Sequence, residues 1–212
     1  MKNIKSKMEC ACLKMNLKYS ASLTGEPFLF YEIRQVARLK LKGLSEREIK
    51  EEVRSKNLFQ YATEKSIAKR VNAVLKRLRL LDETMLQYLL EKPSATARII
   101  NLYAIMKANR LVMEFIIEMV GEKFAVHNLR LDKKDINEFF LEKREQSEDI
   151  ARWQDNTIKK LKQVLLRILS ESGILDEKDG LSLHRPELEP EVIGHLEAKG
   201  ESALLKAMGI SI

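Results

Sequence analysis

The sequence predicts an all-α, mostly helical fold, with a helix-turn-helix-like N-terminal part and a winged-helix-like C-terminal part that carries a short β-hairpin. Only 8 of the 212 residues are Gly and 4 are Pro, a composition that favours helices. Apolar residues recur at helical spacing along most of the chain. With 45% hydrophobic residues, the chain is long enough to bury a core, as one compact domain or two small ones.

The chain begins with a basic segment, residues 1–18, which we predict to be a disordered tail. The stretch "SASLTGEPF" (20–28) is typical of a turn that leads into a helix. A helix is predicted over about residues 27–42, because apolar residues recur there every three or four positions. Gly43 follows as a natural C-terminal residue of this helix.

A short helix and a long basic helix come next. Ser45 and Glu48 have the spacing of a capping box in front of the short helix. The stretch "NLFQYAT" (57–63) breaks the helical period, and Thr63 is expected to cap a helix that runs to about Leu81. A short helix, a brief connection and a long helix form the organisation of a helix-turn-helix.

The most apolar region lies in the middle of the chain. Residues 95–121 predict one or two helices that are hydrophobic on more than one side, the best candidate for a central core element, which Gly121 closes. Charged residues interrupt this region every few positions, so we do not expect it to span a membrane. Asp132 and Asp135 predict the cap of a further helix. We expect a cytoplasmic protein without a membrane partner.

The C-terminal part contains a second basic helix. Thr157 is expected to cap "IKKLKQVLLRILSES", which Gly173 ends. Asp179 and Gly180 lie between two short apolar runs, which is the signal of a hairpin. A basic helix followed by a small hairpin is typical of the end of a winged helix, and Pro190 starts a further short helix.

These patterns divide the chain into four segments. We predict, in order, a basic disordered tail, a helix-turn-helix-like domain, a set of central core helices and a winged-helix-like domain, over residues 1–18, 19–92, 93–150 and 151–212.

The charge is unevenly distributed along the chain. The total is +7, but residues 1–81 hold 19 basic and 8 acidic residues, a net of +11, and residues 152–169 hold 5 and 1, a net of +4. The stretches between and after them, 82–151 and 170–212, are net acidic. Folding could therefore gather the basic zones onto shared faces that attract polyanions.

The stretch "KSIAKRVNAVLKRLRLL" (65–81) contains six Lys or Arg and no acid. Most solvated helices mix acids with bases, because like charges four residues apart repel, whereas a polyanion that releases counterions would offset this repulsion. A solvated basic face remains the alternative interpretation. Arg70→Glu and Arg77→Glu are expected to weaken binding without unfolding the protein. The candidate nucleic-acid contacts, mostly to phosphates and with Ser66 and Asn72 nearer the bases, are Lys65, Ser66, Lys69, Arg70, Asn72, Lys76, Arg77, Arg79, Lys159, Lys160, Lys162 and Arg167.

The sequence contains no motif of an enzyme or a metal site. The glycines stand singly, so there is no phosphate-binding loop, and neither GxSxG nor HExxH occurs. Cys10 and Cys12 form a CxC pair without a second pair, and His127, His184 and His195 lack metal-ligand spacing. We therefore expect no catalysis, no metal and no cofactor.

Several segments occur in a distinctive order. The first is "YSASLTGEPFLFYEIRQVARLKLKGLSEREIKEEVRSKNLFQYATEKSIAKRVNAVLKRLRLLD", and "NRLVMEFIIEMV", "INEFF" and "SEDIARWQDNTIKKLKQVLLRILSESGILD" follow it. In their order and spacing they resemble the small A component of BREX phage-defence systems. The resemblance covers roughly residues 19–210, and no single motif carries it.

The resemblance implies a non-enzymatic, mostly helical accessory protein that binds double-stranded DNA with low sequence specificity. It would work as a monomer beside other BREX components, such as a methyltransferase and an ATPase. Members of this family are often labelled putative inner-membrane proteins, a label that the charges in the apolar region argue against. Two alternatives stay open: a protein-interaction scaffold within the defence complex, and an RNA-binding protein similar to a bacterial antitermination factor.

Overall fold

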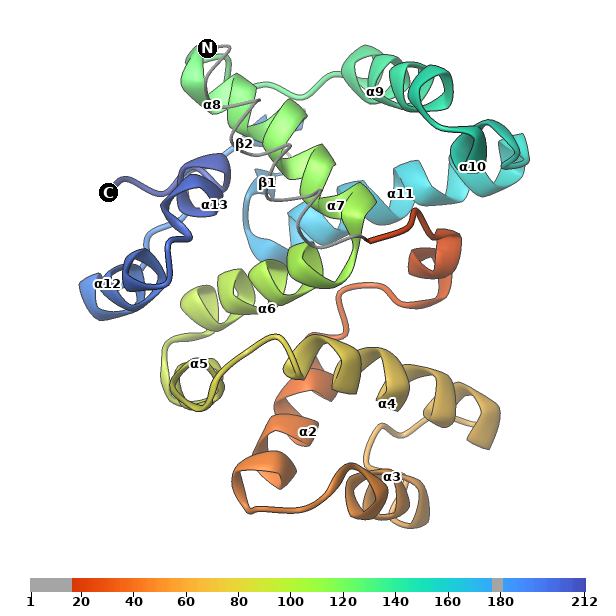
Figure 1. The fold of residues 1–212 in the computed structure, drawn as a ribbon, viewed down its shortest axis with the longest axis vertical. Coiled ribbons are helices and arrows are strands. Elements are labelled where there is room, and N and C mark those ends of the chain that lie inside the picture. The colour runs from red at the N-terminus through yellow and green to blue at the C-terminus, as the bar shows by residue number, and fades with distance from the viewer. Residues whose placement is uncertain (1–16, 177–180) are drawn as a thin grey trace.

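The computed structural model describes residues 17–176 and 181–212 and is mostly helical (Figure 1), which confirms the predicted fold class. Most of the predicted tail, both cysteines and the predicted hairpin turn lie outside the described residues. The elements are, in chain order, η1 (Ala21–Gly25), α2 (Phe30–Leu41), α3 (Glu46–Ser55), α4 (Glu64–Leu78), α5 (Glu83–Glu91), α6 (Ser94–Ala108), α7 (Arg110–Phe115), the π-helix η2 (Ile116–Gly121), α8 (Glu122–Ala125), α9 (Lys133–Gln146), α10 (Glu148–Ala151), α11 (Asp155–Ser172), β1 (Leu175–Asp176), β2 (Ser182–Leu183), α12 (Pro190–Ala198) and α13 (Ser202–Ala207).

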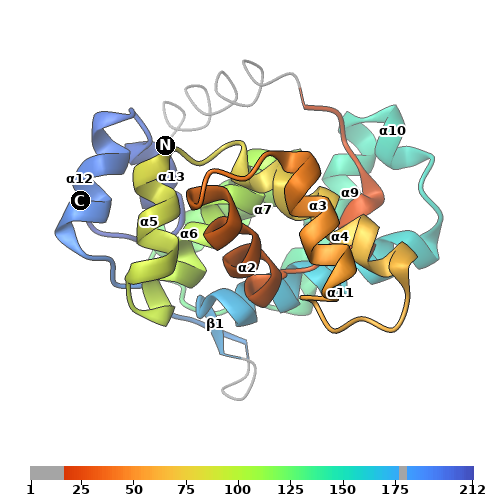
Figure 2. The ribbon, with the colours of Figure 1, turned by 90° about the horizontal axis from the view of Figure 1, so that it is seen from below.

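Helices α2, α3 and α4 pack against one another at one end of the molecule (Figures 1 and 2). The predicted capping box is confirmed, because the Ser45 hydroxyl accepts from the Glu48 N–H while the Glu48 carboxylate accepts from the Ser45 N–H. Thr63 caps α4 as predicted, by accepting from the Ser66 N–H. Helix α4 packs on α2, α3 and α6, so more than one of its sides is buried.

Three predicted helix limits outside the central apolar region were wrong. Helix α2 begins at Phe30 rather than near residue 27, after Leu29 in a left-handed conformation with φ 53°. Helix α4 ends at Leu78, three residues before the predicted end. Helix α11 begins at Asp155, with Gln154 as its N-cap, so Thr157 lies inside the helix and does not cap it.

The central apolar region forms α6, α7, η2 and α8. Asn109 has an extended backbone and caps α7 through its side chain, so it separates α6 from α7. The sequence predicts that the helical region ends at Gly121, and this was wrong. The helical path continues through α8. Gly121 allows α13 to approach, because a Cβ there would stand 3.1 Å from the Cα of Ala207. No helix within residues 17–176 and 181–212 is both long and apolar enough to cross a membrane.

Strands β1 and β2 pair antiparallel, with Leu175 opposite Leu183. A segment ahead of α9 also bonds to the second half of this hairpin: the Leu183 N–H donates to Leu129 and the Leu131 N–H donates to Leu181. Strand β2 therefore has backbone partners on both of its sides, β1 on one and residues 129–131 on the other. The winged-helix assignment of this part stays a prediction, as does the division of the chain into four segments.

The buried apolar side chains form a single cluster that extends from Leu23 to Ile210. It includes residues from α2, α3 and α4 as well as from α11, α12 and α13. The N-terminal three-helix unit is thus fixed to the rest of the described chain by a shared core.

Candidate nucleic-acid interface

One side of α4 carries four of the predicted contact residues. Lys65, Lys69, Asn72 and Lys76 are all exposed. At 3.6 residues per turn their positions fall within roughly 60° of arc around the helix axis. Within residues 17–176 and 181–212, none of the three lysines takes part in an ion pair or a hydrogen bond. No carboxylate from the later half of the described chain pairs with these lysines.

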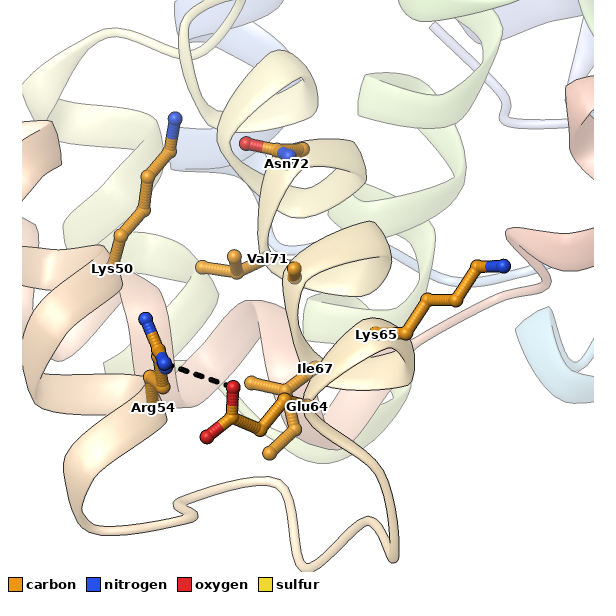
Figure 3. A pocket seen from close by; sticks show the side chains of 8 residues that line it. Lys50, Arg54, Glu64, Lys65, Ile67, Val71 and Asn72 are labelled. Atoms are coloured by element: carbon orange, nitrogen blue, oxygen red, sulfur yellow. Dashed lines mark ion pairs between the residues drawn. The ribbon is translucent and has the colours of Figure 1, made fainter.

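A groove of about 390 Å³ lies between α4 and helix α3 (Figure 3), and of these four residues Lys65 and Asn72 line it. Two basic side chains of α3, Lys50 and Arg54, lie across it from Asn72 of α4, whereas Lys65 also lines the groove but its ammonium points away from α3 (Figure 3). Its lining residues are Lys50, Arg54, Glu64, Lys65, Ile67, Ala68, Val71 and Asn72. The groove thus has an apolar floor and a rim with three cations and one acid.

A second hollow, of about 620 Å³, continues along α3 and shares Lys50, Arg54 and Glu64 with the groove. Its lining adds Arg47, Glu51 and Ser55. Sequence reasoning missed the three cations of α3, although Arg47, Lys50 and Arg54 have the i, i+3, i+7 spacing of one helix side. The acids interspersed along α3 concealed this pattern.

Arg77 does not belong to this surface, and its prediction as a phosphate contact was wrong. Its side chain is only 3% exposed and points away from the groove. The guanidinium donates to the carbonyl oxygens of Glu26, Pro27 and Phe28, at 2.7, 2.8 and 2.9 Å. Burial lowers the pKa of Arg77 to about 10, which leaves it charged at neutral pH. Its role is to hold the segment in front of α2.

Two other predicted contacts are engaged within the protein. Arg79 forms a two-point ion pair with Glu46, one contact being 2.6 Å from Nε to the carboxylate. This pairing raises the pKa of Arg79 and lowers that of Glu46. Ser66 is half-buried in the first turn of α4.

Arg70 lies on a different side of α4 from the lysines. Its guanidinium stacks 4.1 Å from the centre of the Tyr61 ring, and its Nε is buried without a hydrogen-bond partner. Burial and a hydrogen bond to Glu32 raise the pKa of Tyr61 to about 12, although the charges of Arg70 and Arg167 oppose this shift. Arg70 is therefore a partly structural cation.

The predicted contacts on α11 are divided in the same way. Lys159 and Lys160 are exposed and have no ion pair with the described residues. Lys162 donates to the Asn137 amide oxygen at 2.6 Å, and Arg167 pairs with Glu171 at 2.6 Å. In Figure 1, α11 lies above α4, and the segment that leads into α2 passes between them. Helix α11 also packs on η1 within that segment.

The fold and the groove together define a mostly helical protein with a basic groove between two neighbouring helices. The family model BrxA matches residues 17–200, which is most of the chain. The chain belongs to the BrxA family, whose members are components of BREX phage-defence systems. The family resemblance inferred from the sequence is thereby confirmed.

Individual relatives support this membership. A "BREX protein BrxA" of Bacillus cereus (strain H3081.97) is 39% identical over 184 residues, which cover 86% of this chain and 92% of the relative. A "BREX protein BrxA" of Escherichia coli O9:H4 (strain HS) is 25% identical over 197 residues, or 92% of each chain. A crystal structure of an uncharacterized protein from Magnetospirillum magneticum matches the fold with a TM-score of 0.77 at 21% identity, over 92% of this chain and all of that one.

Proposed function

We propose that this chain is a non-enzymatic accessory protein of a BREX system that binds double-stranded DNA in the α3/α4 groove. The observation that carries the proposal is the side of α4 where Lys65, Lys69 and Lys76 lie exposed without a carboxylate partner among the described residues, beside a groove that two cations of α3 also line. Unpaired surface cations in a row repel one another, and phosphates that neutralise them release counterions.

The contacts divide by chemistry. Lys50, Arg54, Lys65, Lys69 and Lys76 supply phosphate contacts, which position the duplex without reading its sequence. Asn72 stands among them on the exposed side of α4, and an Asn side chain can form two hydrogen bonds to an adenine edge. Because cations outnumber base-reading candidates, the proposed binding has low sequence specificity.

Helix α11 provides a second, smaller contact in this proposal. Its exposed cations Lys159 and Lys160 are free to bind phosphate, and Arg167 could exchange Glu171 for a phosphate because exposed ion pairs are weak. The protein would act as a cytoplasmic monomer and leave other faces available to further BREX components.

Fluorescence anisotropy with a labelled duplex tests the proposal. If about five phosphates are neutralised, the slope of log affinity against log salt should be about −4.5. The double variant Lys65→Gln/Lys76→Gln should reduce the slope by about 2, since each lost phosphate contact removes about 0.9. The matched control is Lys133→Gln/Lys206→Gln, which removes two exposed lysines from α9 and α13 and should change nothing.

Parallel titrations with single-stranded DNA and structured RNA separate the other classes. Preference for structured RNA would replace the duplex by RNA as the ligand. A flat salt dependence, or equal losses in the two double variants, would contradict the groove as the binding site. The chain would instead be a protein-interaction scaffold if it bound no nucleic acid and captured an acidic BREX component through the same lysines.

A further inference from the structure

Glu64 is the one acidic side chain among the eight that line the α3/α4 groove. It also lines the hollow along α3, so it lies where the two concavities meet. Its carboxylate points across the groove toward α3 (Figure 3), where Oε2 lies 2.9 Å from Nη2 of Arg54. An anion is therefore already present at the position where a backbone phosphate would meet Arg54.

This ion pair contributes little to the fold. The side chains of Arg54 and Glu64 are 66% and 71% exposed, and solvent screens exposed pairs of this kind so that they contribute little to stability. The neighbouring pair of Arg79 and Glu46 has two contacts and shifts the pKa of both partners. The Arg54–Glu64 contact is thus the one that an incoming anion can displace.

The position of Glu64 in α4 does not require the pair. As the first residue of the helix, an acid there interacts favourably with the N-terminal end of the helix dipole. Glu83 occupies the same position at the start of α5, also after a capping residue, and forms no ion pair with the described residues. The contact with Arg54 therefore needs an explanation of its own.

We propose that Glu64 is an internal phosphate mimic that sets the selectivity of the groove, an inference that rests on the proposed function. In the free protein its carboxylate occupies Arg54. A nucleic-acid backbone must displace it, and Arg54 then donates to a phosphate oxygen with the same planar geometry. Isolated anions gain little from this exchange, whereas a duplex that also contacts Lys50 and Lys65 offsets its cost. Glu64 thereby weakens binding of ligands that present only one phosphate.

The test is a double-mutant cycle measured by duplex titration. Glu64→Gln should tighten duplex binding about fivefold at moderate salt, because Arg54 then no longer has to release a carboxylate before it binds a phosphate. For this variant the slope of log affinity against log salt should steepen by about 0.9, because duplex binding then releases one more counterion. In an Arg54→Gln background the same change should tighten binding by less than about twofold, because the guanidinium for which Glu64 and a phosphate compete is then absent. Glu83→Gln is the matched control and should leave affinity unchanged.

The outcomes separate this inference from the proposed function. Duplex binding by the native chain with loss in Lys65→Gln/Lys76→Gln establishes the groove independently of Glu64. Unchanged or weaker binding of Glu64→Gln would then overturn the phosphate-mimic role alone. Equal gains from Glu64→Gln with and without Arg54 would also overturn it, because they would reduce Glu64 to a general negative charge. Absence of duplex binding by the native chain would overturn both.

Discussion

Arg77 and its neighbour Lys76 offer a sharp separation between stability and binding. Arg77 is buried and donates to three carbonyl oxygens, whereas Lys76 is exposed on the same side of α4 as Lys65 and Lys69. Replacing Arg77 by Met keeps most of the apolar stem and removes all three hydrogen bonds. The same replacement at Lys76 removes only a solvated charge. The two variants lie one residue apart in the same helix.

The size of the effect follows from the contacts. A hydrogen bond to a charged group contributes ~1.5–3 kcal/mol, but part of this is offset because Met no longer carries a charge into the core. We expect Arg77→Met to lower the free energy of unfolding by about 3–5 kcal/mol, as for other broken buried charged networks. In a chain of this size that corresponds to a fall in Tm of about 10 °C. Arg77→Lys should fall in between, because one ammonium cannot satisfy three carbonyl oxygens.

Urea unfolding followed by circular dichroism measures the first effect, and duplex titration the second. Lys76→Met should change the free energy of unfolding by less than about 0.5 kcal/mol, as for exposed substitutions in general, while weakening duplex binding. Arg77→Met should do the opposite at temperatures where it remains folded. A stable Arg77→Met protein with weakened duplex binding would refute the assignment of Arg77 to the fold.

Three further changes test other parts of the structure. Lys143 is 3% exposed and pairs with two carboxylates, so Lys143→Ala should cost about 3–5 kcal/mol in urea unfolding, and a change below ~1 kcal/mol would contradict its burial. Gly209 has φ 84° and a Cβ there would stand 2.6 Å from a Phe124 ring carbon, so Gly209→Ala should lower Tm by several degrees, about 1–3 kcal/mol, unless the ring can move. Burial alone would raise the pKa of Asp82, but hydrogen bonds, first among them that from Lys199, lower it from 3.8 to about 2. The stability that its carboxylate contributes is present above pH 3.8 and is lost as the pH falls toward 2. Asp82→Asn should therefore flatten the profile of unfolding free energy against pH between these values. An unchanged profile at acid pH would argue against the pairing.

The features that the sequence predicts well are local. The capping box of Ser45 and Glu48 involves groups three residues apart, so its residues determine it without help from the rest of the chain. Gly173 ends α11 with φ 85°, a conformation that Gly adopts without strain. The paired strands on either side of Asp179 and Gly180 follow from two short apolar runs.

The start of α2 depends on contacts that sequence spacing does not reveal. Pro27 favours a helix start near that position, because its φ is fixed and its missing N–H costs nothing there. In the structure, Arg77 binds the carbonyl oxygens of residues 26, 27 and 28, so those carbonyls face the guanidinium instead of continuing a helix. The chain turns through Leu29 before α2 begins. A residue fifty positions later thus decides where the helix starts.

The same contrast explains which cations form the candidate interface. Seven of the predicted contacts share a helix whose basic count suggests a single charged face, yet helical geometry separates them. Arg77 follows Lys76 by one residue and therefore points about 100° away from it. That rotation is enough to turn its side chain from the exposed lysine side of α4 to the carbonyls in front of α2. Which side is buried depends on what packs there, and for α4 that includes residues far away in the sequence.

A count of basic residues consequently overestimates how much charge is available to a ligand. Arg77 holds backbone carbonyls, Arg79 is paired with Glu46, and Arg70 is stacked on Tyr61. The cations that remain are mainly lysines, whose long stems and compact charge suit phosphate contacts that tolerate movement. The arginines, with their planar forks, are used where fixed geometry matters. For a duplex bound mainly by the lysines, the slope of log affinity against log salt should therefore depend on five contacts and not on the net charge of the N-terminal third. Neutralising Arg79 should alter that slope far less than neutralising Lys76.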